Sequence, residues 1–118
     1  MNKHFYVLIC MTSLFLFSCL KTGEEKMKIP NPPSNLQVEI LASSTIRVFW
    51  TDNSEDEHEF EVQVKKDTEP WDLATWAGTN VTEYTNAYYA TGHTYTFRVR
   101  ASNTAGYSSF SNEASITL

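Results

Sequence analysis

The chain has 118 residues, enough for one domain, and it carries 9 Lys and Arg against 14 Asp and Glu, a formal net charge of -5. Apolar residues make up 42% and charged residues 19%, a balance typical of a globular chain rather than a disordered one. The acidic balance leaves no basic stripe for phosphates, so we expect no nucleic-acid partner, and two Cys exclude a disulfide-dense fold.

The N-terminal residues have the pattern of a secretory signal. Lys3 gives a short positive start, and residues 5–17 form an apolar run of 13 residues. This run is too short to span about 30 Å of hydrocarbon as a helix, which takes about 20 residues. Its length suits the apolar part of a signal peptide, and we predict that residues 1–18 are one.

The four residues Leu16-Phe17-Ser18-Cys19 resemble the lipobox of bacterial lipoproteins. The resemblance implies cleavage before Cys19 and acylation of its thiol. The protein would then be a lipid-anchored membrane protein of the bacterial cell envelope, expected at the outer membrane or cell surface. A transmembrane anchor, or an ordinary signal with an incidental Cys, is the alternative. Acyl chains contribute about 0.8 kcal/mol per buried CH₂, so two or three would anchor the protein stably.

Residues 19–32 are polar, mixed in charge and rich in Pro near their end. No apolar period runs through them, and Pro removes both a backbone donor and helical freedom. We therefore predict a partly extended tether here, followed by a domain that comprises residues 33–118.

Within that domain apolar and polar residues alternate with period two, which indicates half-buried strands. The predicted strands cover residues 36–40, 46–50, 60–64, 73–77, 83–86, 95–101 and about 108–117. Apart from the signal, no window has a helical period. Seven short strands with turn chemistry between them predict an all-β fold, a sandwich of two sheets.

Two motifs carry a family resemblance. Residues 44–50, Ser-Thr-Ile-Arg-Val-Phe-Trp, end in Trp50, and residues 89–101 match the pattern L-x-P-G-x-x-Y-x-F-R-V-x-A, with Tyr89 and Thr91 in place of Leu and Pro. Both motifs resemble a fibronectin type III domain, and the resemblance covers residues 33–118. It implies a seven-stranded immunoglobulin-like sandwich in which the hydroxyl of Tyr95 bonds to backbone upstream, forming a tyrosine corner. The predicted core contains Leu36, Trp50, Val62, Tyr95, Phe97 and Val99.

Residues that could carry chemistry are few. The acidic run at residues 52–61 has no central Gly, and its twelfth position from the first Asp is Gln63, so it fails the EF-hand pattern. We interpret it as a solvated loop that leads into a strand whose Glu59 and Glu61 face outward, beside Arg98 and Arg100. Nucleophile, zinc and phosphate-loop motifs are absent. We therefore expect no enzyme, no metal and no cofactor.

Five aromatic residues lie outside the inward-facing series: Trp71, Trp76, Tyr88, Tyr107 and Phe110. Three of them, Trp71, Trp76 and Tyr107, form a candidate binding surface. The alternative is that they only cover a sheet edge. We expect a monomeric, non-catalytic envelope lipoprotein whose domain binds an unknown protein or glycan, as an adhesion or interaction module. The competing hypothesis is a spacer or accessory domain of an extracellular carbohydrate-hydrolase system.

Overall fold

The computed structural model describes residues 27–118, so the predicted signal peptide, Cys19 and most of the predicted tether lie outside the described residues. The described chain contains eight strands: β1 (Ser34–Ala42), β2 (Thr45–Thr51), β3 (Glu59–Lys66), β4 (Asp72–Gly78), β5 (Glu83–Asn86), β6 (Thr94–Asn103), β7 (Gly106–Tyr107) and β8 (Ala114–Thr117). Among residues 27–118, no helix is long and apolar enough to cross a membrane.

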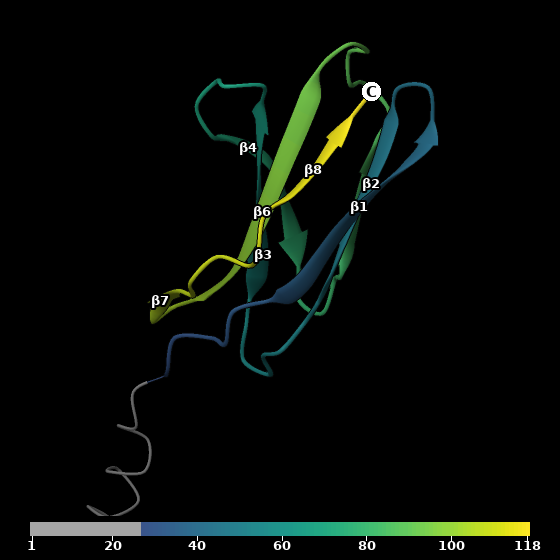
Figure 1. The fold of residues 1–118 in the computed structure, drawn as a ribbon. Helices are drawn as coiled ribbons and strands as arrows, with labels where there is room; N and C mark the ends of the chain where they lie inside the picture. Colours follow the sequence, from purple (N-terminus) through teal and green to yellow (C-terminus); the bar gives the residue numbers. More distant parts are fainter. Residues whose placement is uncertain (1–26) are drawn as a thin grey trace, which may run out of the picture.

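The strands form two sheets that pack against each other (Figure 1). One sheet has the order β1-β2-β5, and the other has the order β4-β3-β6-β7, with β8 also paired to β6. All of these pairings are antiparallel. The predicted all-β two-sheet sandwich is confirmed, with eight strands in the described residues instead of seven.

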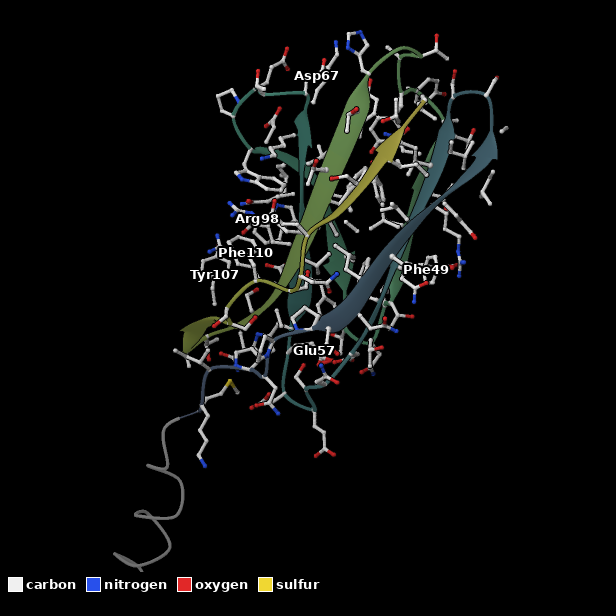
Figure 2. All side chains as sticks on the ribbon, in the orientation of Figure 1. Phe49, Glu57, Asp67, Arg98, Tyr107 and Phe110 are labelled. Atoms are coloured by element: carbon white, nitrogen blue, oxygen red, sulfur yellow. The ribbon has the colours of Figure 1, made fainter. Side chains whose placement is uncertain are left out.

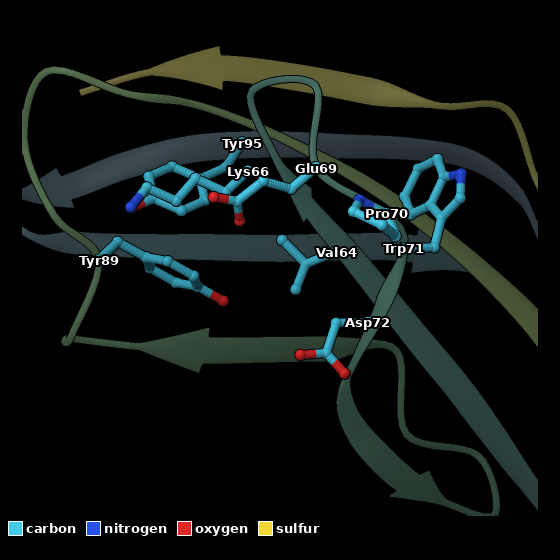
Figure 3. A pocket seen from close by; sticks show the side chains of 8 residues that line it. All are labelled: Val64, Lys66, Glu69, Pro70, Trp71, Asp72, Tyr89 and Tyr95. Atoms are coloured by element: carbon cyan, nitrogen blue, oxygen red, sulfur yellow. The ribbon is translucent and has the colours of Figure 1, made fainter.

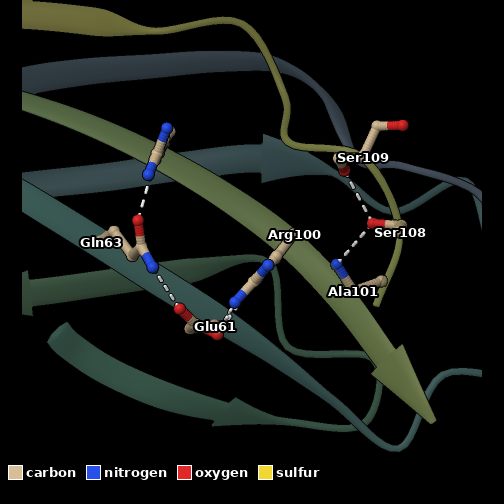
Figure 4. Close-up of polar contacts among 7 residues, drawn as sticks. Glu61, Gln63, Arg100, Ala101, Ser108 and Ser109 are labelled. Carbon is tan, nitrogen blue, oxygen red and sulfur yellow. Dashed lines mark hydrogen bonds and ion pairs between the residues drawn. The ribbon is translucent and has the colours of Figure 1, made fainter. Parts of the chain in front are cut away.

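The additional strand is β7, which lies before the last predicted strand, and only residues 114–117 of that predicted strand (about 108–117) form a strand, β8. Between β7 and β8 two serines replace the regular ladder along β6. The backbone N–H of Ala101 donates to the hydroxyl of Ser108 at 2.9 Å, and that of Val99 donates to the hydroxyl of Ser111 at 3.1 Å. Side-chain oxygens thus satisfy donors that a continuous strand would pair with its carbonyls (Figure 4).

The core lies between the sheets and is formed by the inward side chains of both. It consists of Leu36, Ile46, Val48, Trp50, Phe60, Val62, Ala77, Tyr95, Phe97, Val99 and Ala101. All six residues that the sequence placed in the core belong to this set. The ring of Trp50 packs against that of Phe60 with centroids 5.6 Å apart, which joins the two sheets.

The connection between β5 and β6 contains the predicted tyrosine corner. The hydroxyl of Tyr95 accepts a hydrogen bond from the backbone N–H of Ala90 at 2.9 Å and donates one to the Ala90 carbonyl at 3.2 Å. The ring of Tyr89, which stands where the family pattern has Leu, packs against Tyr95 and Phe97 at centroid distances of 4.8 and 5.9 Å. The larger side chain is therefore accommodated as part of the core boundary.

Residues 27–33, here called the N-terminal strap, run along one end of the sandwich. Asn103, the last residue of β6, donates to the carbonyl of Lys28 at 2.7 Å. Asn53, in the loop after β2, donates to the carbonyl of Pro32 at 2.9 Å, and Asn31 donates to the carbonyl of Asn53 at 3.0 Å. The described end of the predicted tether is thus packed against the domain.

Candidate functional site

The outer face of the five-stranded sheet carries two rows of side chains that cross β4, β3 and β6 in register. The rows consist of Trp76, Glu61 and Arg100, and of Leu73, Gln63 and Arg98. Neighbouring strands lie about 4.8 Å apart, so the members of a row are in reach of one another.

Above these rows aromatic rings and arginines alternate in a stack, here called the aromatic–arginine column. The guanidinium carbon of Arg98 lies 4.1 Å from the ring centroid of Trp71 and 3.9 Å from that of Phe110. Arg100 lies 4.6 Å from Phe110 and 3.8 Å from Tyr107. Figure 2 shows Arg98, Phe110 and Tyr107 along this side of the sheet. Each guanidinium therefore contacts two aromatic rings, and the attraction between the cation and the rings stabilises this arrangement.

A chain of hydrogen bonds links the two arginines through β3 (Figure 4). Arg98 donates from Nε to Oε1 of Gln63 at 2.8 Å, and Gln63 donates from Nε2 to Oε1 of Glu61. The other oxygen of Glu61 accepts from Nε and Nη2 of Arg100 at 3.1 and 2.9 Å. The predicted pairing of Glu61 with an arginine of β6 is therefore present, whereas Arg98 faces an amide.

The structure brings the three predicted binding residues to this one face. Trp76 and Tyr107 are 44% and 48% exposed, and Leu73 beside them is 47% exposed. Trp71 is half-buried because Arg98 and Lys65 lie over its ring, with Lys65 Nζ 5.0 Å from the centroid. The sequence did not identify the stacking of Phe110 on Arg98, since only the irregular path after β7 turns that ring outward.

In the acidic loop after β2, the expectation that all the carboxylates are solvated is wrong. Glu57, predicted to be solvated, is only 3% exposed, and its Oε1 has no hydrogen-bond partner among the described residues. Its Oε2 lies 3.2 Å from the hydroxyl of Ser54, whose backbone N–H donates to Asp52 at 2.9 Å. Burial, followed by the neighbouring Asp52 carboxylate, raises the pKa of Glu57. Within residues 27–118 no cluster of three or more His, Cys, Asp and Glu is arranged to hold a metal ion.

A hollow of about 350 Å³ opens beside the turn between β3 and β4 (Figure 3). Val64, Tyr89 and Tyr95 form its apolar part, and Lys66, Glu69, Pro70, Trp71 and Asp72 complete its lining. Its polar groups are the ammonium of Lys66, the carboxylates of Glu69 and Asp72, the indole N–H of Trp71 and the hydroxyls of Tyr89 and Tyr95, and the lining contains no Ser, Thr, Cys or His. Desolvation raises the pKa of the Tyr89 hydroxyl, which keeps that side chain neutral.

Comparisons with known proteins agree with this architecture. Residues 31–117 match the family model of the fibronectin type III domain. Among curated proteins, none is similar enough to the chain to count as a relative.

Solved structures with the same fold are numerous. Titin kinase with its flanking domains is 26% identical with a TM-score of 0.67, and the match covers 77% of this chain and 18% of that one. The sixth fibronectin type III domain from human fibronectin type III domain containing protein 3 is 18% identical (TM-score 0.65), with 79% and 89% covered. An Fn3-like protein from Clostridium thermocellum is 23% identical (TM-score 0.62), with 75% and 92% covered. The chain spans less than a third of the first three chains in this comparison.

Proposed function

The chain belongs to the fibronectin type III family, and from that premise we propose that it is a non-catalytic interaction module held at the bacterial cell envelope by a lipid on Cys19. Domains of this family commonly act as interaction or spacer modules and are in general not catalytic. The ligand-binding surface of this protein is the outer face of the five-stranded sheet.

The exposed aromatic side chains of that face are the observation that carries the proposal. Trp76 and Tyr107 expose nearly half of their surface on a face that also holds two ordered arginines. Trp, Tyr and Arg are the residue types that most often dominate binding energy at interfaces. Exposed apolar groups gathered on one face, rather than scattered singly, are a feature of binding surfaces.

The outer face of the other sheet lacks this combination in the described residues. Its arginine, Arg47, is held between Glu39 and Glu83 at 2.9 and 2.8 Å. The guanidinium also lies 4.2 Å from the centroid of Phe49 and so covers the aromatic ring there. On this side the arginine is therefore neutralised, whereas the five-stranded sheet has the exposed Trp76 and an arginine, Arg98, that pairs with an amide and no carboxylate, which favours it as the binding side.

Cross-linking in intact cells, followed by mass spectrometry, tests the interaction. We expect a reproducible envelope partner or glycan for the native protein and its loss in a Trp76→Ala, Tyr107→Ala variant. Leu41→Ala is the matched control, because Leu41 is exposed on the other sheet. A partner retained in the double variant contradicts the binding face. Absence of any partner contradicts the interaction function and favours the spacer or accessory domain of a hydrolase system.

Membrane fractionation of a Cys19→Ser variant tests the lipid anchor. The thiol is the acceptor of the lipid in lipoproteins, and acylation binds a protein to a membrane through its buried CH₂ groups. We expect the native protein in the membrane fraction and the variant in the soluble fraction. Unchanged membrane association of the variant would overturn the lipoprotein proposal but leave the binding face untouched.

A further inference from the structure

We propose that Arg98 anchors a binding site for a carboxylated sugar carried in a largely neutral glycan. The sugar carboxylate pairs with the guanidinium of Arg98, and neighbouring sugar rings lie on Trp76 and Tyr107. This proposal rests on the interaction function proposed above and names the ligand class of the same face.

Arg98 is held in place but lacks a carboxylate. Two aromatic rings contact its guanidinium, and Gln63 accepts from its Nε. Among residues 27–118, no side chain or carbonyl accepts a hydrogen bond from its two terminal nitrogens, whereas Arg47 and Arg100 both pair with glutamates. An arginine that is ordered before binding loses little side-chain entropy when it pairs with an anion.

The hydrogen-bond chain explains why Arg98 stays available. Both oxygens of Glu61 are engaged, one by Arg100 and the other by Gln63. The amide of Gln63 must therefore donate to Glu61 and present its oxygen to Arg98. A neutral amide orients Arg98 without neutralising it, so the positive charge remains for a ligand.

The fork of the Arg98 guanidinium suits a carboxylate. The rings of Trp71 and Phe110 contact this guanidinium, with centroids 4.1 and 3.9 Å from its central carbon. A carboxylate pairs with both terminal nitrogens through two parallel hydrogen bonds. A sulfate or phosphate forms the same two bonds with two of its oxygens, so the test below includes a sulfated polymer.

The surrounding charge limits the ligand to few carboxylates. Lys65 lies over the ring of Trp71 beside Arg98 and has no ion pair among the described residues, so two cations meet at this point. The chain as a whole has a net charge of -5 and repels dense polyanions. A glycan with isolated acidic sugars is attracted by Arg98 and Lys65, and because it carries few charges the acidic chain repels it only weakly.

The spacing of the exposed aromatic rings on the face favours a sugar over a peptide. Trp76, Arg98 and Tyr107 line none of the three hollows found on the described residues, although Trp71 lines the one beside the turn between β3 and β4. Trp76 lies two strand spacings from Arg98, about 10 Å, and one row along, about 7 Å. At that distance the ring of Trp76 is in reach of another sugar unit of the same extended glycan, and the C–H face of that sugar stacks on the ring.

Affinity measurements with the full chain purified in detergent test the proposal. The probe is glucuronoxylan, and the same polymer with its carboxyl groups reduced to alcohols is the matched control. Poly-L-glutamate and dextran sulfate test a peptide carboxylate and a tetrahedral anion. We expect binding to glucuronoxylan that falls at least tenfold after carboxyl reduction, and at least tenfold weaker binding of the two other polymers.

Protein variants locate the site. Arg98→Lys keeps the charge but loses the fork, and Trp76→Ala removes the second contact; each should weaken glucuronoxylan binding about tenfold or more. Arg47→Lys, on the other sheet, should bind like the native protein. A thermal melt of each variant shows that its fold is retained, and Gln63→Glu, which places a carboxylate beside Arg98, provides a second variant that should lose binding.

Several outcomes overturn the proposal. Equal binding to reduced glucuronoxylan shows that the carboxylate does not contribute to binding. Equal binding to poly-L-glutamate shows that the site does not distinguish a sugar from a peptide, and equal binding to dextran sulfate shows that it does not distinguish a carboxylate from a sulfate. Full binding by Arg98→Lys or Gln63→Glu, or no binding to any polymer, also contradicts it. If these tests fail while the cross-linked partner still depends on Trp76 and Tyr107, the interaction function stands with a different ligand.

Discussion

The hydroxyl of Tyr95 is both acceptor and donor to a single residue, Ala90, five positions earlier in the chain. Because both backbone groups of Ala90 are satisfied by one side chain, the connection between β5 and β6 is fixed at its crossing point. The ring of Tyr95 is buried, so water is poorly placed to replace the hydroxyl.

Tyr95→Phe should therefore lower the free energy of unfolding by about 1–3 kcal/mol, since two backbone groups lose their partner while the ring stays in place. Chemical denaturation measures this loss: the midpoint concentration of denaturant should fall, while the slope of unfolding free energy against denaturant concentration should stay unchanged. Tyr88→Phe is the control, because Tyr88 is 92% exposed and its hydroxyl should contribute nothing measurable. Equal stability of the two variants would show that the corner bonds do not hold the connection.

Trp50→Ala should lower the free energy of unfolding by about 3–5 kcal/mol, the range for removing a large buried aromatic side chain. Trp50 is 5% exposed and joins the sheets through Phe60. Its indole N–H has no hydrogen-bond partner in the described residues, so Trp50→Phe should cost less. Trp76→Ala, on the exposed face, should change stability by less than about 0.5 kcal/mol. An unaltered melting temperature of Trp50→Ala would contradict the core position.

Glu57→Gln should change how stability depends on pH. The folded protein raises the pKa of Glu57 above its ordinary value of 4.5, so it binds this proton more tightly than the unfolded chain does. The resulting stability is present below pH 4.5 and is lost as pH rises through the raised pKa. The variant should show a smaller loss of unfolding free energy from pH 4.5 toward neutrality. Glu55→Gln removes an exposed charge from the same loop as a control, and identical pH profiles of the Glu57 variant and native protein would contradict the effect.

Asn103→Asp should loosen the N-terminal strap without disturbing its own turn. The substitution removes the Nδ2 donor to the carbonyls of Lys28 and Asp56 but keeps the oxygen that accepts from the N–H of Ala105. Limited trypsin digestion should then cleave after Lys28 several times faster than in the native protein, because cleavage needs a locally released backbone. Gln37→Glu, on β1, is the matched amide-to-acid control, and equal cleavage rates would show that Asn103 does not retain the strap.

The sequence was sufficient for the strands that follow a regular period. Val48 and Trp50 in β2, and Phe97 and Val99 in β6, alternate with polar residues, so the pleat itself determines which side is buried. The tyrosine corner was predictable from the resemblance of residues 89–101 to the fibronectin type III pattern, which places Tyr95 at the start of a strand after a Gly turn.

Features that depend on contacts between residues distant in sequence were not predictable from the alternation of apolar and polar residues. Glu57 lies in a loop whose composition indicates solvation, and only the packing around it produces its burial. The outward turn of Phe110 requires Ser108 and Ser111 to replace strand pairing on β6. The candidate face was therefore predicted as separate aromatic residues, while the stacking that orders Arg98 could be seen only in the fold.

The strap lies at one end of the sandwich, and the last described residue, Leu118, lies at the other (Figure 1). Leu118 is itself held there, since its N–H donates to the carbonyl of His93 and its carbonyl accepts from the N–H of Gly92. Tension between these two points runs along the strands, whereas the ladder bonds of β1 with β2 and of β6 with β8 lie across them. The ladders are thus loaded in shear, so that many bonds share the force. The few hydrogen bonds of Asn53 and Asn103 to the strap bear the force first. We therefore expect the strap to detach, which lengthens the molecule slightly, before the strands of either sheet separate.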